Sequence, residues 1–218
     1  MTTITQDQLE SLKQLQSCAI SNAIETFEVK PRNEGFMSSE IKCMFPNLGG
    51  MIGYATTAII AADAPPSNNM NVPRPRWFDE VLKIPEPRVV VMHDLDAPNP
   101  VGSFWGEVQS NIHRRLGCVG TVTDGGVRDI DEMENLGFHA FSSGVLVSHA
   151  YIHVVDVNIP LNVGGQKVSP GDIIMGDKHG VLTIPKEIAA DIPEAVKKIE
   201  LRERTIIDLC NSVEFDLD

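Results

Sequence analysis

The spacing of apolar residues separates helical from extended segments in the first part of the chain. Leucines at helical spacing predict a helix over residues 6–15, and a second helix is expected over residues 21–27. Residues 50–60 are rich in β-branched and small side chains, which predicts a strand. Residues 63–75 contain several Pro, Asn and Ser residues and are predicted to form a surface loop rather than a linker between domains.

The middle of the chain alternates between strand and helix patterns. Residues 88–93 include an uninterrupted apolar run, as in a strand that is covered on both faces. Helical spacing follows from Val108 and ends at Gly117, a residue suited to the position after a helix. Another strand is predicted over residues 118–123, and after a Gly-Gly turn a short helix is expected over residues 130–136.

The last third of the chain is predicted to be rich in strands and to end in a long helix. Residues 140–168 have a β-rich pattern, residues 181–184 form a further strand stopped by a proline, and a helix is expected over 186–210. Together these segments predict a mixed α/β fold. We expect one domain over residues 1–218, with residues 1–16 as a helical extension at the N-terminus.

Composition and charge narrow the possible functions. Apolar residues make up 42% of the 218 residues, and 30 acids against 18 Lys and Arg give a formal charge of -12. This balance argues against binding to nucleic acid or to an anionic membrane surface, both of which need excess cations. The four cysteines form no C-x-x-C motif, and the N-terminal residues lack the pattern of a signal peptide. No apolar run is long enough for a membrane span, and we expect a cytoplasmic protein.

The candidate chemistry gathers around two short motifs. Gly106 and Glu107 are expected at a helix start, where free backbone N–H groups favour an anion. Arg128 and Asp129 follow the next strand, whose end returns beside that helix start if the two strands are parallel. Arg can bind a carboxylate through two hydrogen bonds, and Asp offers an oxygen ligand for Mg²⁺ or Mn²⁺. The same residues are also compatible with a first-turn acid and a solvated turn pair, and spacing alone leaves both interpretations open.

The two motifs together resemble the RraA-like family. Gly106-Glu107 is followed after twenty residues by Arg128-Asp129 and then by Glu132, and residues 168–185 and 19–25 carry further similarity. This family includes the class II 4-hydroxy-4-methyl-2-oxoglutarate aldolases and the regulators of ribonuclease E activity. The resemblance covers residues 17–205 or so and implies a swivelling α/β/β sandwich.

In the aldolase branch, the resemblance implies a role for each residue of the motifs. The backbone amides of the helix start would hold the carboxylate of a pyruvyl group, Arg128 would grip the substrate and Asp129 would bind the metal, Mg²⁺ or Mn²⁺. That cation would stabilise the pyruvate enolate as a carbon–carbon bond of the α-keto acid breaks, and oxaloacetate would lose CO₂ through the same species. The amides that the resemblance assigns to the carboxylate are those of Gly106, Glu107, Val108 and Gln109.

The resemblance also carries a departure and an alternative. The aldolases have Asp where this chain has Glu107, which is one methylene longer. They borrow a carboxylate from the C-terminal helix of a neighbouring subunit, for which Glu203 is the candidate, so a homotrimer or homohexamer is expected. The alternative is a protein that docks on a ribonuclease and catalyses nothing.

Other polar residues are interpreted as structural. His149 and His153 are expected on one strand, about 13 Å apart and too distant to share an ion. His93, Asp94 and Asp96 follow a strand end, where shaping of the loop is favoured over metal binding.

Overall fold

The computed structural model describes residues 4–67, 70–213 and 215. Six α-helices and a short 3-10 turn are placed as follows: α1 (Gln6–Lys13), α2 (Ser17–Glu25), η1 (Pro46–Leu48), α3 (Arg74–Leu82), α4 (Glu107–Arg115), α5 (Ile130–Leu136) and α6 (Ile192–Cys210). The strands are β1 (Lys42–Cys43), β2 (Met51–Ala61), β3 (Arg88–Asp94), β4 (Cys118–Thr123), β5 (Gly126–Val127), β6 (His139–Ser142), β7 (Gly144–Val145), β8 (His153–Val157), β9 (Leu161–Val163), β10 (Gln166–Val168), β11 (Ile173–Asp177) and β12 (Gly180–Ile184). The mixed α/β fold expected from the sequence is confirmed.

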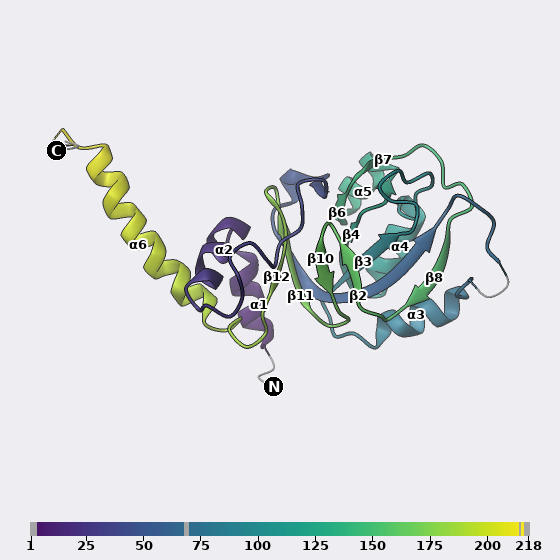
Figure 1. The fold of residues 1–218 in the computed structure, drawn as a ribbon, viewed down its shortest axis with the longest axis horizontal. Coiled ribbons are helices and arrows are strands. Elements are labelled where there is room, and N and C mark those ends of the chain that lie inside the picture. Colours follow the sequence, from purple (N-terminus) through teal and green to yellow (C-terminus); the bar gives the residue numbers. More distant parts are fainter. Residues whose placement is uncertain (1–3, 68–69, 214, 216–218) are drawn as a thin grey trace.

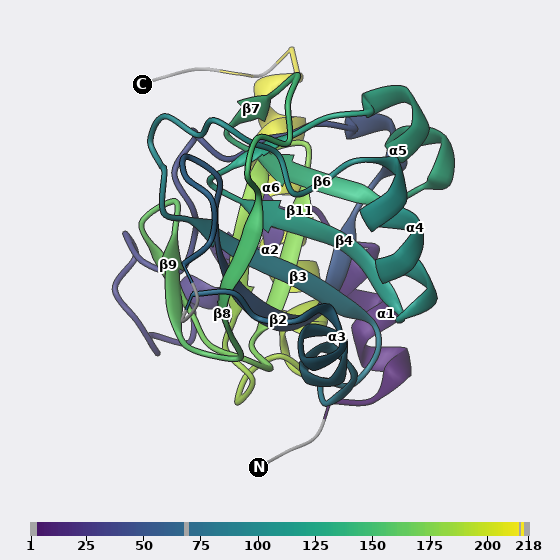
Figure 2. The ribbon, with the colours of Figure 1, turned by 90° about the vertical axis from the view of Figure 1, so that its right-hand side faces the viewer.

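The main sheet has a parallel centre and antiparallel flanks. Its order is β1-β6-β4-β3-β2-β11-β12, with β8 also pairing with β2. Strands β2, β3, β4 and β6 run parallel and lie side by side in Figure 2, whereas β11, β12, β8 and β1 pair antiparallel. Helix α4 connects β3 to β4, and α5 lies between β4 and β6, as expected for parallel neighbours that need crossover connections.

Strand β3 shows why an uninterrupted apolar run predicts a central strand. Val89 and Val91 pack in a core shared with β9 and β10, while Val90 and Met92 pack in a second core with α3 and α5. All four side chains are fully buried. Because successive side chains point to opposite faces of a strand, both faces of β3 must be covered, and both are.

A third core lies at the antiparallel end of the sheet. Helices α1 and α2 and the first turns of α6 pack there against β11 and β12 (Figure 1). Beyond residue 200, every described residue of α6 is exposed, and the ribbon extends away from the sheet. Leu201 is 71% and Ile206 63% exposed, so this half of the helix presents apolar side chains without a partner among the described residues.

Several element boundaries differ from the predictions. Helix α2 starts four residues earlier than expected, at Ser17, because the carboxylate of Asp177 accepts the Ser17 backbone N–H and hydroxyl at 2.7 Å each. Helix α6 starts at Ile192 rather than at residue 186, after a stretch of turns. No strand was expected over residues 173–177, where β11 pairs with both β2 and β12.

The predicted surface loop over residues 63–75 is only partly correct. Its last two residues already belong to α3, which begins with a proline in its first turn and buries Trp77 and Val81. Residues 68 and 69 of that prediction lie outside the described residues. None of the described helices combines the length and apolar content needed to cross a bilayer.

Candidate active site

The start of α4 and the segment after β5 form one site. Gly106 is the N-cap residue of α4 and has an extended backbone (φ -171°). As a glycine, it has no side chain that could cap the helix. The Asp129 carboxylate fills this role instead, because its Oδ2 accepts the backbone N–H of Glu107 at 3.0 Å. The prediction that Arg128 and Asp129 return beside the helix start is therefore confirmed, and the parallel pairing of β3 and β4 is the reason.

A short backbone connection holds the Arg128–Asp129 segment in place. Trp105 and Val127 form a parallel bridge, and the Arg128 N–H donates to the Trp105 carbonyl at 3.0 Å. Trp105 itself is fully buried among aromatic side chains. The segment is thus anchored on the residue that immediately precedes Gly106, which brings both motifs together without any side-chain ion pair.

Asp129 has an unusual backbone conformation. Its φ and ψ are both 52°, in the left-handed region that non-glycine residues rarely adopt. Its carbonyl accepts the N–H of Met133, so the residue also begins α5. Backbone strain of this kind concentrates at functional sites, and here it directs the carboxylate towards the start of α4.

Gly106 is required by close approach rather than by its backbone angles. A Cβ at this position would lie 2.5 Å from Asp129 Oδ2 and 3.2 Å from Arg128 Cγ. Only glycine leaves room for both side chains at the helix start. This contact explains the Gly residue that stands before Glu107 in the motif.

Arg128 is available to bind a ligand. Its side chain is 37% exposed, and its Nε lies 3.7 Å from Asp129 Oδ2, a long ion pair. Within the described part of the chain, neither terminal nitrogen of the guanidinium group has a hydrogen-bond partner. The planar guanidinium group can therefore donate two parallel hydrogen bonds to a carboxylate.

The remaining predicted residues differ in their exposure and in their hydrogen-bond partners. Glu107 and Val108 have exposed side chains, and Glu107 makes no ion pair with any described residue. Gln109 places its Oε1 in a buried position without a hydrogen-bond donor from the described chain. Glu203 lies on the exposed half of α6. In Figure 1 this helix extends away from the sheet on the side opposite to α4 and α5, so its exposed half does not reach this site within one chain.

The donor set at the site fits a hard divalent cation that keeps most of its water. No group of three or more His, Cys, Asp or Glu side chains suited to a metal exists among the described residues. Asp129 is partly exposed, with one oxygen bonded to Glu107 and the other carrying no hydrogen bond from the described residues. Mg²⁺ commonly binds through one or two carboxylates plus water and substrate oxygens, so one Asp with Glu107 nearby is a sufficient donor set.

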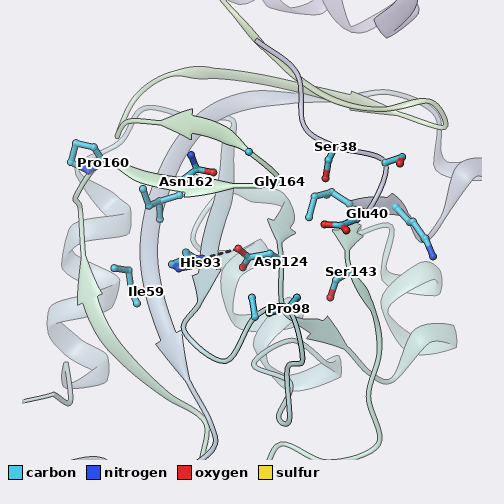
Figure 3. A pocket seen from close by; sticks show the side chains of 16 residues that line it. Ser38, Glu40, Ile59, His93, Pro98, Asp124, Ser143, Pro160, Asn162 and Gly164 are labelled. Carbon is cyan, nitrogen blue, oxygen red and sulfur yellow. Dashed lines mark hydrogen bonds and ion pairs between the residues drawn. The ribbon is translucent and has the colours of Figure 1, made fainter. Parts of the chain in front are cut away.

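A separate cavity of about 830 Å³ lies at the carboxyl ends of the parallel strands (Figure 3). At its centre, His93 Nδ1 lies 2.7 Å from Asp124 Oδ2. Asp124 Oδ1 also accepts the backbone N–H of Asp94 at 2.7 Å. The hydrogen bond to Asp124 raises the pKa of His93, and burial raises the pKa of Asp94 to about 6.

The sequence-based interpretation of this strand end is confirmed in part. Asp96 does shape the loop, because its Oδ2 accepts the N–H groups of Ala62 and Asp63 at 2.7 and 3.0 Å. Asp94 accepts the N–H of Asp96. His93 instead lines the cavity together with Asp124, which directly follows β4 and for which the sequence predicted no function. Their position at neighbouring strand ends was the available signal.

The expected strand carrying both His149 and His153 is wrong. His149 lies in a loop, His153 begins β8, and the Nδ1 of each lies 2.8 Å from a nearby backbone carbonyl. These contacts agree with a structural role.

Comparison with known proteins places this geometry in context. The profile of the RraA-like family, described as Aldolase/RraA, matches residues 17–183. A protein of Halalkalibacterium halodurans, provisionally named a 4-hydroxy-4-methyl-2-oxoglutarate aldolase, is 34% identical over 108 residues. The match covers 47% of this chain and 51% of that relative, so it spans about half the length of each.

Two solved structures share the fold. An uncharacterized protein from Pseudomonas syringae superposes with a TM-score of 0.75 at 24% identity, over 98% of this chain and 92% of its own. RraAS2 of Streptomyces coelicolor is described as an unusual member of the RNase ES inhibitor RraA protein family. It superposes with a TM-score of 0.71 at 18% identity, over 94% of this chain and 98% of its own. Since the family profile matches well over half of the sequence, the chain belongs to the RraA-like family.

Proposed function

We propose that the protein is a divalent-metal-dependent carbon–carbon lyase that releases pyruvate from a 4-hydroxy-2-oxo acid and also decarboxylates oxaloacetate. One observation carries this proposal: the Asp129 carboxylate accepts the backbone N–H of Glu107, and the partly exposed Arg128 guanidinium group lies beside it. A carboxylate-binding group and a cation-binding group are thus adjacent at a helix start that already accommodates an anion. Family membership and the name of the Halalkalibacterium relative support the same chemistry.

Arg128 and the first amides of α4 would bind the carboxylate of the substrate. Asp129 now bonds to the Glu107 N–H, and turning away from it would free that amide for the substrate. The helix dipole favours the negative charge at this position. The substrate would then lie between the guanidinium group and the helix start, with its 2-oxo group towards Asp129.

Asp129, with Glu107 nearby, would hold the cation, which when bound supplies Lewis-acid polarisation of the 2-oxo group. Glu107 is exposed at the same helix start and is assigned to take the proton of the 4-hydroxyl group. As that proton leaves, the O–H electrons form a C=O bond at C4, and the C3–C4 bond breaks with its electrons moving towards the 2-oxo group. The C4 fragment departs as a carbonyl compound, and a proton added at C3 completes pyruvate. In oxaloacetate, loss of CO₂ takes the place of the aldol cleavage.

A second subunit would complete the site. The exposed half of α6 carries Glu203 together with unpartnered Leu201 and Ile206, and it lies far from α4 in its own chain. We propose that this half-helix packs on a neighbouring copy in a trimer or a pair of trimers. Glu203 would then reach the neighbour's site.

The proposed function is tested by pyruvate release from oxaloacetate and from 4-hydroxy-4-methyl-2-oxoglutarate, each measured with Mg²⁺ and with EDTA. Asp129→Asn should abolish Mg²⁺-dependent release, whereas Asp131→Asn, an exposed acid on α5, serves as the matched control and should keep it. Metal-independent release, or equal rates for the two variants, would contradict the proposed lyase.

The second candidate is a non-catalytic regulator that binds a ribonuclease. The exposed apolar side of α6 is the observation that favours it, because such surfaces commonly bind proteins. Absence of turnover with both substrates, together with binding of a ribonuclease that is lost in Leu201→Asp, would favour this candidate over the lyase.

A further inference from the structure

The cavity beside His93 lies where ligands bind in open α/β sheets. Parallel strands β3, β4 and β6 end next to one another, and the residues at or just after their ends, His93, Asp124 and Ser143, line the cavity. Its volume, about 830 Å³, is in the range of about 300–1,000 Å³ that small-molecule sites occupy. None of the residues Gly106, Glu107, Arg128 and Asp129 lines it, so the cavity is separate from the site assigned to the lyase.

The walls of the cavity are mainly apolar. Ile59 and Leu161 contribute side chains from β2 and β9, and Pro98 and Pro160 contribute rings from two loops (Figure 3). Water in contact with such walls is readily displaced by a hydrocarbon group. The ligand that fits therefore has an apolar body.

The hydrogen bonds of Asp124 determine what His93 offers to that ligand. Both Asp124 oxygens are used, one by the Asp94 N–H and one by His93 Nδ1, and each distance is 2.7 Å. This fixes the ring and leaves Nε2 as the nitrogen without a hydrogen-bond partner in the described chain. The Asp124 hydrogen bond also raises the pKa of His93, while burial acts against it. A ring that carries a proton on both nitrogens presents an Nε2–H to the cavity.

The other charged groups around the cavity are Glu40 and Lys42, which are exposed on the segment that also carries Ser38. Their charges balance each other. Asp124 offsets the charge of a protonated His93, so the ring acts on a ligand as a directed hydrogen-bond donor at the centre of the cavity. A carboxylate is the acceptor that best matches an Nε2–H.

From this arrangement we propose that the cavity is a second small-molecule site, which binds a monocarboxylate with a branched or extended apolar body through His93 Nε2. The proposal stands on the cavity and the His93–Asp124 contact and does not depend on the lyase activity. The carboxylate would accept the Nε2 hydrogen, and the hydrocarbon part would contact Ile59, Leu161 and the two prolines.

The probe is 4-methylpentanoate, which lacks the 2-oxo group, and its uncharged counterpart is 4-methylpentanamide. Binding is measured by calorimetry. In ¹⁵N spectra of the histidine rings, the Nε2 signal of His93 is the one that is absent from His93→Gln. This signal should shift when the probe is added. We expect the carboxylate to bind at least about tenfold more tightly than the amide and His93→Gln to weaken it by a similar factor.

Two variants separate this cavity from the lyase site and from damage to the fold. Asn162→Trp places an indole in the cavity from an exposed position on β9, and should abolish binding while thermal unfolding stays unchanged. Arg128→Gln should leave binding unchanged. The proposal is overturned if wild type does not bind the probe at concentrations on the order of 10 mM, if His93→Gln binds it equally well, or if Arg128→Gln loses it.

Discussion

Asp129 has two competing partners at the residue scale. In the structure, its carboxylate caps α4 through the Glu107 N–H, whereas the proposed function assigns it to a divalent cation. The left-handed backbone at φ 52° directs the side chain to a position from which either partner is reached. Loading of the site is therefore expected to be a local change of one side chain, with little movement of α4.

Gly106→Ala tests how tightly the site is packed. The new methyl group would lie 2.5 Å from Asp129 Oδ2 and would displace the carboxylate, so pyruvate release should fall about 100-fold. Since φ is -171°, alanine adopts this backbone without strain, and stability should fall only by the loss of the Asp129 cap on α4, about 1 kcal/mol. Gly144→Ala is the control, because a Cβ there meets nothing within 4 Å. Equal activity of both variants would show that the close approach is irrelevant to function.

Arg128→Lys tests the planar fork separately from its charge. Lysine keeps the positive charge but loses the two parallel hydrogen bonds, so kcat/KM for pyruvate release should fall about 100-fold. Arg115→Lys, at an exposed position at the end of α4, should behave as wild type. Near-normal kinetics for Arg128→Lys would remove this residue from the substrate site.

Among the helices and strands, the local pattern of apolar residues predicted those whose stabilising contacts lie close in the sequence. Strand β3 was predicted from its apolar run, and α5 was predicted with its observed bounds. Gly117 does follow α4 with a positive φ of 73°, as its position after the helix requires.

Contacts between distant parts of the chain account for the errors in the predicted elements. The start of α2 depends on Asp177, which is 160 residues away, and β11 is a strand because β2 and β12 pair with it on both sides. The short apolar face of α3 is stabilised by packing of Trp77 next to His113 of α4, at a ring distance of 5.8 Å. None of these partners is visible in the local pattern of the segment concerned.

His113 makes the junction of α3 and α4 sensitive to acid. Its ring accepts the Trp77 Nε1–H at 2.9 Å, and burial lowers its pKa from 6.5 to about 4. The neutral ring is favoured in the folded state, so its contribution to stability is complete above pH 6.5 and is lost as pH falls towards 4. The loss should reach about 3 kcal/mol.

Urea unfolding at pH 7 and at pH 4 measures this contribution. His113→Gln keeps a hydrogen-bond acceptor but does not titrate, so it should lose less stability between the two pH values than wild type does. His139, whose pKa burial also lowers to about 4, is present in both proteins and cancels. An exposed control, His149→Gln, should follow wild type. Identical pH dependence of His113→Gln and wild type would contradict the assignment.

For the molecule as a whole, the net charge of -12 is compatible with an anionic substrate, because the electrostatic potential at the binding site is determined mainly by the groups next to it. Arg128, the start of α4 and a bound cation would provide positive potential within one site. The other acids are expected to matter for solubility, and their excess over Lys and Arg disfavours nucleic acid as a ligand.

The exposed half of α6 predicts self-association. Leu201 and Ile206 remain 71% and 63% exposed in a single chain, and packing on a second copy would remove them from water. Leu201→Asp with Ile206→Asp should reduce the mass measured by light scattering to that of one chain. Lys198→Asp, on the same helix, is the charge control and should leave the mass unchanged. A wild-type protein that is already monomeric would contradict the proposed trimer.

Only one part of the candidate site was predictable from the sequence, namely the positions of the chain segments that the strand order brings together. Parallel β3 and β4 return Asp129 to the start of α4, and this was expected from the pattern. The anchor through Trp105 and the cavity around His93 were not, because both depend on side chains that converge from several elements.

If Asp129 holds a divalent cation beside Arg128, the protein must bind Mn²⁺ through this carboxylate. Electron paramagnetic resonance measures free Mn²⁺ as protein is added in the presence of pyruvate. Wild type should deplete the free-ion signal in proportion to its concentration, and Asp129→Asn should not, while Asp131→Asn should match wild type. An undiminished signal with wild type, or equal depletion by Asp129→Asn, would contradict the claim.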